Sequence, residues 1–158
     1  MKPTVASTIA FIQQAHAGQA DKQGLPYWLH LHAVMERLGA ASDNERMAAL
    51  LHDVLEDTPT TAVDLLNMGY PEEVAVAVQL VTRPRNPKPP YIEWIRSIAA
   101  SGNATAIRIK IADCEHNSDP DRLASIPIEA ERTSLAKRYS KALSILRPPA
   151  PGKEGENE

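Results

Sequence analysis

Residues 48–58 read AALLHDVLEDT, and this stretch places a His-Asp pair inside an apolar helical segment. Apolar residues recur three and four positions apart here and along most of the chain, which is the periodicity of helices. In such a helix Asp53, Glu56 and Asp57 share one face. Three carboxylates crowded beside the His52 imidazole repel one another unless a cation offsets them. Imidazole and carboxylate ligands suit manganese, iron or zinc.

The same stretch has a simpler interpretation as a helix cap or a solvated acidic face. The apolar residues on both sides of His52 and Asp53 disfavour that interpretation. A cation held by one helix would lack ligands, and His30 or His32 on the preceding segment could supply another. Spacing alone does not choose between these two histidines.

Asp113 is a further candidate ligand, because it follows the largely apolar segment 106–112, AIRIKIA. Burying an unpartnered carboxylate costs several kcal/mol, so Asp113 needs a cation nearby. A salt bridge to Lys110 or Arg108 is the alternative to a metal ion.

The whole pattern predicts an all-α protein of roughly seven or eight helices in one domain over residues 1–147. Proline and glycine positions and a Ser42–Glu45 capping box set the expected boundaries. Helices are expected near 5–17, 26–39, 42–55, 60–68, 71–82, 91–100, 104–116 and 128–146. Residues 83–90, RPRNPKPP, hold four prolines and three cations, so they predict a cationic loop. Residues 148–158 have no core-forming side chains and are expected to be a disordered tail.

Composition narrows the class of protein. The chain has 158 residues and a formal net charge of −3, which argues against a nucleic-acid binder. No apolar run is long enough to span a bilayer, and the N-terminus lacks the pattern of a secretion signal. The single cysteine, Cys114, allows no internal disulfide. These features predict a cytoplasmic chain with no nucleic-acid or membrane partner.

Four ordered stretches resemble the HD superfamily of metal-dependent phosphohydrolases, and more closely the hydrolase domain of RelA/SpoT-type alarmone enzymes and their small stand-alone relatives. The resemblance covers about residues 5–125. The stretches are AHAGQ at 15–19, GLPYWLH at 24–30, AALLHDVLEDT at 48–58, and IKIAD at 109–113 followed by His116-Asn117. A lone His-Asp pair would be weak evidence, whereas four stretches in the family's order are specific.

The resemblance implies a set of roles, residue by residue. It selects His30 over His32 and implies a Mn²⁺ site, or a site for another divalent transition metal. The metal ligands would be His30, His52, Asp53 and Asp113. Glu56 and Asp57 match an acidic pair that orients the attacking water. The residues implied to contact substrate are Lys22, Lys110 and Asn117, and the cationic loop adds Arg83 and Lys88, with Arg85 between them, as candidates for phosphate contact.

The implied reaction removes the 3′-diphosphate of (p)ppGpp as pyrophosphate. Asp21-Lys22 stands where the long enzymes have an arginine against the nucleotide, and Cys114-Glu115 also departs from the family pattern. Alternatives are therefore a phosphatase of another nucleotide, such as a nucleoside monophosphate or the 2′-phosphate of NADPH, or a non-catalytic nucleotide sensor. Tyr91 and Trp94 are expected in the core, and the cations of the last helix, Arg138 among them, on a solvated face or at a subunit contact.

Overall fold

The computed structural model describes residues 1–148, so all but the first residue of the predicted tail lies outside the described residues. Regular structure in this part of the chain is helical, apart from one isolated β-bridge between Ala20 and Pro26. The all-α prediction is therefore confirmed. The helices are α1 (Val5–Ala15), α2 (Trp28–Arg37), α3 (Asp43–Leu50), α4 (Val54–Asp57), α5 (Ala62–Asn67), α6 (Glu72–Leu80), α7 (Tyr91–Ala100), α8 (Ala104–Asn117), α9 (Pro120–Ala124) and α10 (Glu129–Leu146).

The helix predicted over 42–55 is in fact two helices. It begins as expected, with Ser42 and Glu45 closing a capping box at the start of α3. It ends at Leu50, and just beyond this end the Ala49 carbonyl accepts both the His52 backbone N–H at 3.3 Å and the His52 side-chain Nδ1–H at 2.7 Å. The backbone tightens there, with the Val54 N–H donating to the Leu51 carbonyl, and α4 starts afresh.

Two other differences from the prediction concern the start of the second helix and an additional short helix. The second helix begins at Trp28, because Pro26 is held in the bridge to Ala20 instead of lying in the first helical turn. The short helix α9 was not predicted at all; Asp119 caps it and Pro120 occupies its first turn. These changes raise the helix number above the predicted seven or eight within residues 1–148.

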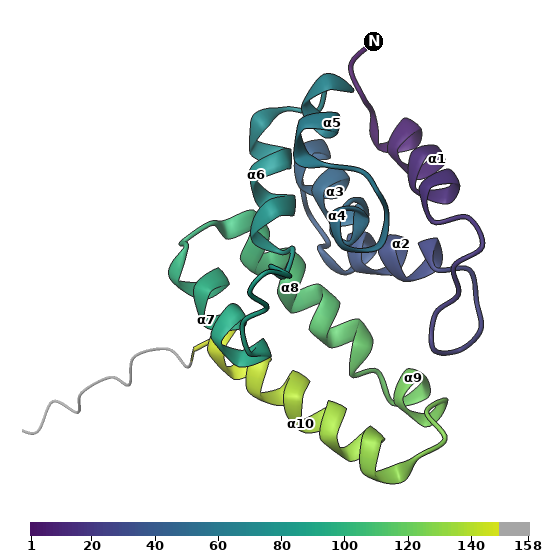
Figure 1. Ribbon diagram of the computed structural model, residues 1–158, viewed down its shortest axis with the longest axis vertical. Coiled ribbons are helices and arrows are strands. Elements are labelled where there is room, and N and C mark those ends of the chain that lie inside the picture. The colour runs from purple at the N-terminus through teal and green to yellow at the C-terminus, as the bar shows by residue number, and fades with distance from the viewer. Residues whose placement is uncertain (149–158) are drawn as a thin grey trace, which may run out of the picture.

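Helix α8 is the centre of the architecture. It packs against α2, α3 and α6 on one side and against α7 and α10 on the other. Figure 1 shows α8 running between the N-terminal group of helices and the long α10. Its apolar side chains Ala106, Ile109 and Ala112 are buried in the core with Leu31 of α2 and Leu50 of α3. This packing holds α8 against α2 and the end of α3, the three places from which the polar cluster arises.

Within residues 1–148, no helix has the length and apolar character needed to cross a membrane.

Candidate active site

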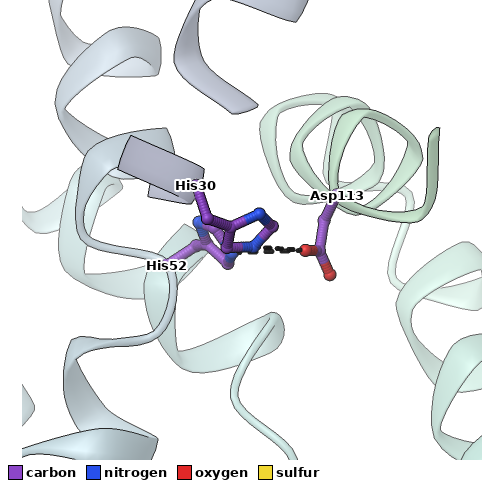
Figure 2. Close-up of side chains that lie close together, drawn as sticks. All are labelled: His30, His52 and Asp113. Atoms are coloured by element: carbon purple, nitrogen blue, oxygen red, sulfur yellow. Dashed lines mark ion pairs between the residues drawn. The ribbon is translucent and has the colours of Figure 1, made fainter. Parts of the chain in front are cut away.

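Buried and partly buried ligand-type side chains from three parts of the chain converge on one point. His30 comes from α2, His52 and Asp53 from the turn between α3 and α4, and Asp113 from α8. His30 Nε2 lies 3.1 Å from Asp113 Oδ1, and His52 Nε2 lies 3.5 Å from the same oxygen. Asp53 Oδ2 lies 3.2 Å from His52 Nε2 and 3.9 Å from His30 Nε2. Figure 2 shows the two imidazoles facing the Asp113 carboxylate.

These separations fit a single divalent cation. Neighbouring ligand atoms that each lie about 2.0–2.2 Å from one ion are about 3–3.5 Å apart. The ligand atoms of His30, His52 and Asp113 all lie within 4.8 Å of one another. The His52 Nδ1 contact with the Ala49 carbonyl requires a proton on Nδ1, so in the neutral imidazole Nε2 carries the lone pair. That Nε2 is buried and makes no hydrogen bond within residues 1–148. A buried, unpaired nitrogen facing carboxylates is the arrangement of a metal ligand.

The sequence left His30 and His32 open, and the structure separates them. His30 is buried in the cluster. His32 lies on the outer side of α2, where its Nδ1 is 3.6 Å from Glu36 Oε1 and its side chain is about one-third exposed.

Asp113 is held by two neighbours on its own helix. Lys110 Nζ donates to Asp113 Oδ2 at 2.6 Å, and Asn117 Nδ2 donates to Oδ1 at 2.9 Å. The salt bridge considered as an alternative to a metal ion is therefore present together with the histidine cluster. Arg108 does not take part, because it pairs with Glu45. Burial would raise the pKa of Asp113, but the Lys110 ammonium and the two imidazoles hold it well below its usual range.

The acidic pair lies beside this cluster on α4. Glu56 Oε1 accepts the Arg83 backbone N–H at 2.6 Å. Burial raises the pKa of Glu56; the Arg83 N–H opposes this, and the charge of Asp53 adds to it. Burial and the charge of Asp53 also raise the pKa of Asp57. Raised pKa values suit carboxylates that accept a proton near neutral pH.

Two cavities flank the cluster, and the predicted substrate residues divide between them. The nucleoside cavity, as we name it, has a volume of about 280 Å³ and is lined by His30, Asp53 and Asp113 together with Lys22, Asn117 and Tyr139. The cationic cavity has a volume of about 530 Å³ and contains Asp53, Glu56 and Asp57 on one wall. Its five cations are Arg83, Arg85, Lys88, Lys110 and Arg138. All the predicted site residues except His52 therefore line one cavity or the other, with Asp53 shared.

The 83–90 loop is attached to the acidic helix. Arg85 donates to the Glu56 carbonyl, and Arg83 donates both its backbone N–H to the Glu56 carboxylate and its guanidinium to the Pro89 carbonyl. The Arg83 guanidinium also lies 5.6 Å from the Tyr91 ring centre. The loop is therefore a wall of the cationic cavity, whereas the sequence could not distinguish this from a solvated loop.

Other residues of the site were missed or misjudged. Arg138 is exposed, as expected, but its guanidinium also lies 4.5 Å from the Tyr91 ring centre and lines the cationic cavity, which the sequence did not indicate. Tyr91 and Trp94 line this cavity as well, and Trp94 is buried as expected. Tyr27 donates its hydroxyl to Asp53 Oδ2 at 2.5 Å. The PYxxH spacing that carried the resemblance contained Tyr27, but nothing in the sequence indicated its partner.

Arg122 was also missed as a part of the site. It is buried, pairs with Asp21 at 3.0 Å and lines the nucleoside cavity. Asp21, one of the residues that depart from the family pattern, therefore has a structural role. Besides pairing with Arg122, it accepts the backbone N–H groups of Gln23 and Leu25.

No family model matches the chain. The chain is similar to curated bacterial proteins, however. It is 38% identical over 114 residues to the bifunctional (p)ppGpp synthase/hydrolase SpoT of Escherichia coli (strain K12), a match that covers 66% of this chain and 16% of that protein. It is 35% identical over 114 residues to a guanosine-3′,5′-bis(diphosphate) 3′-pyrophosphohydrolase of Haemophilus influenzae, covering 66% of this chain and 17% of the relative. The match thus spans about a sixth of the length of these relatives.

A solved structure is similar over nearly the whole chain. It belongs to a metazoan ortholog of SpoT that hydrolyzes ppGpp and plays a role in starvation responses. The TM-score is 0.81 with 25% sequence identity, and the match covers 94% of this chain and 89% of that one. The fold is therefore placed among known proteins by two separate likenesses.

Proposed function

The chain is an HD-type domain similar to the hydrolase domains of RelA/SpoT enzymes, and from this premise we propose that it hydrolyses a phosphorylated nucleotide, with (p)ppGpp as the leading substrate. One observation carries the proposal: a buried His-His-Asp cluster opens, through Asp53, onto a cavity that holds both the acidic pair and five cations. We assign this activity to a single domain of residues 1–147, located in the cytoplasm.

In this proposal His30, His52, Asp53 and Asp113 hold one divalent ion, for which Mn²⁺ is the first candidate. The separations of 3.1–3.9 Å and the unpaired His52 Nε2 support the assignment. Mixed imidazole and carboxylate ligands suit Mn²⁺ but also accept Fe²⁺ or Zn²⁺. When bound, such an ion lowers the pKa of a water molecule and offsets the charge of phosphoryl oxygens.

Glu56 and Asp57 serve as the base in this proposal. Their carboxylates lie on the wall of the cationic cavity next to Asp53. The Arg83 N–H fixes one oxygen of Glu56, which leaves the other free to accept a proton from water. The water oxygen forms the new bond to phosphorus, the bond between phosphorus and the ribose 3′-oxygen breaks, and that oxygen gains a proton. The products are a nucleotide with a free 3′-hydroxyl and pyrophosphate.

The two cavities suggest how the substrate lies. The cationic cavity suits the phosphate groups, since five cations face three carboxylates there. Arginine offers bidentate contacts to phosphate, and lysine a point charge. The nucleoside cavity offers the amide of Asn117 and the ammonium of Lys22 on the other side of Asp53. Lys110 lines the cationic cavity, but its shortest contact is with Asp113. We therefore propose that Lys110 attracts phosphate mainly through its charge and not through a direct contact.

The direct test is product release with added Mn²⁺ from ppGpp, NADPH and a panel of nucleoside monophosphates. The proposal expects pyrophosphate from ppGpp. Release of phosphate from NADPH or a nucleoside monophosphate would support the hydrolase activity but replace ppGpp as the substrate. No turnover with any of these compounds would refute the proposed enzymatic activity and favour a nucleotide sensor.

A matched pair of variants makes the test specific. Glu56→Gln should lose turnover, because it removes a base at the cavity wall. Glu36→Gln changes the same residue type on the outer side of α2, near His32, and should keep it. Equal turnover in the two variants would show that contamination or another site is responsible.

A further inference from the structure

His116 contacts Nδ1 of His30, whereas Nε2 of His30 faces Asp113. It comes from α8, three residues after Asp113. The two Nδ1 atoms are 2.7 Å apart, which is a hydrogen-bond distance, and the ring planes are within 19° of each other. Two imidazole nitrogens at this distance form a hydrogen bond only when one carries a proton and the other does not.

The metal site decides the direction of this hydrogen bond. His30 Nε2 faces Asp113 and His52, so it must present its lone pair if it is to bind a cation. A neutral His30 then carries its proton on Nδ1 and donates it to Nδ1 of His116. His116 is left as the acceptor, with its own proton on Nε2.

We propose that His116 is a positioning residue that fixes the tautomer and ring orientation of His30 for metal binding. The inference rests on the metal site of the proposed function. Metal-bound histidines usually donate their second N–H to a carboxylate, a carbonyl or water, and removing such a partner weakens metal binding. His52 follows that rule through the Ala49 carbonyl. For His30, the partner at Nδ1 is the imidazole of His116.

The surroundings of His116 favour this role over simple packing. His116 is only partly buried and lines a separate cavity of about 500 Å³ with Arg37, Asp119 and Arg122. It therefore fills no gap in the apolar core. Its neighbour Asn117 supports Asp113 in the same way, through a 2.9 Å hydrogen bond. Helix α8 thus supplies the proposed ligand Asp113 together with Asn117, which holds Asp113. It also supplies His116, which contacts the proposed ligand His30.

The test compares two substitutions of His116 by Mn²⁺ titration calorimetry on the full chain. His116→Leu removes the acceptor and keeps an apolar side chain of similar bulk. His116→Asn places a carbonyl oxygen the same number of bonds from Cα as Nδ1, so it can still accept from His30. We expect His116→Leu to weaken Mn²⁺ binding about 10- to 100-fold. His116→Asn should bind close to the unchanged protein.

The order of the two variants separates positioning from packing, because a packing role would make the leucine variant the better binder. His32→Leu, on the outer side of α2, is the matched control and should not change the affinity. Undiminished binding by His116→Leu would overturn the inference while leaving the proposed metal site intact. Absence of Mn²⁺ binding by the unchanged protein would overturn both.

A second measurement reads the hydrogen bond itself. Imidazole ¹H–¹⁵N spectra of the Zn²⁺-loaded protein should show His30 protonated on Nδ1 and His116 protonated on Nε2. A proton on Nδ1 of His116 would overturn the inference, since that nitrogen could not then accept from His30.

Discussion

Lys110 offers the sharpest test of how the candidate site is built. Its ammonium donates to Asp113 Oδ2 at 2.6 Å, and both side chains are less than 10% exposed. Nζ also lies 4.5 Å from the Trp94 ring centre. Burial would lower the pKa of Lys110, but Asp113 raises it, so the side chain is charged. Lys110→Met keeps the length and most of the apolar stem while removing this charge.

The expected loss of stability follows from the burial of the pair. Removing one partner of a buried ion pair costs about 3–5 kcal/mol, because the other charge is left without compensation. Asp113 keeps its contact with Asn117 Nδ2, but Oδ2 loses its nearest donor. We therefore expect Lys110→Met to lower the free energy of unfolding by about 3–5 kcal/mol in metal-free protein.

The assay is urea unfolding, measured in EDTA and again in excess Mn²⁺. A urea slope of about 1–3 kcal/mol/M converts the loss into a midpoint shift of at least about 1 M. A cation present at one hundred times its Kd adds about 2.7 kcal/mol to a folded state that binds it. Because the cation also supplies positive charge beside Asp113, the difference between variant and unchanged protein should be smaller in Mn²⁺ than in EDTA.

Two controls make the result decisive. Arg37→Met breaks a pair with Asp119 that is 3.7 Å long and about one-third exposed at both ends, so it should cost less than about 1 kcal/mol. Adding Asp113→Asn to Lys110→Met should recover part of the loss, because no buried charge is then left unpaired. A Lys110→Met variant as stable in EDTA as Arg37→Met would refute the view that Lys110 compensates Asp113.

Four further outcomes are expected. Asp53→Ala should abolish Mn²⁺ binding and turnover while circular dichroism still reports a helical protein; retained activity would contradict its assignment as a ligand. Glu56→Gln should keep Mn²⁺ affinity in calorimetry but lower kcat by about 10²–10⁴-fold, the usual contribution of a general base. Activity should fall as the pH is lowered through the pKa of the Glu56 and Asp57 pair, since a base works only when ionised. Burial raises both pKa values, so the midpoint of kcat/KM against pH should lie above that of an ordinary carboxylate, and a midpoint at or below it would contradict the raised pKa values. Arg138→Met should raise KM for ppGpp with little change in kcat, whereas Lys141→Met, on the same helix but outside the lining of the cationic cavity, should change neither.

The convergence of the ligand-type residues was predictable because each stands out chemically. His52, Asp53 and Asp113 are polar residues in apolar helical stretches, and such residues need partners wherever the fold places them. The sequence pattern could not choose between His30 and His32, since both lie on one predicted helix and their faces depend on the packing of α2. The resemblance made that choice, and the structure places His30 in the cluster and His32 outside it.

What could not be predicted depends on contacts between distant segments. Arg138 looks like any other cation on a polar helix until α10 packs against α7 and brings it over Tyr91. The break between α3 and α4 coincides with a side-chain contact, that of His52 with the Ala49 carbonyl, which no helical periodicity encodes. The hydrogen bond between His30 and His116 joins residues 86 positions apart.

The distribution of charge links the fold to the proposed chemistry. Four carboxylates surround the cluster, those of Asp53, Glu56, Asp57 and Asp113, and Lys110 is the cation buried among them within residues 1–148. One ammonium offsets one of the four carboxylates, so the site retains a negative excess that a divalent cation would largely offset. The arginines lie farther out, along the 83–90 loop and α10. A phosphate group entering the cationic cavity would therefore meet positive charge on both sides, from the ion within and the arginines at the rim, while the carboxylates between them remain available to accept a proton.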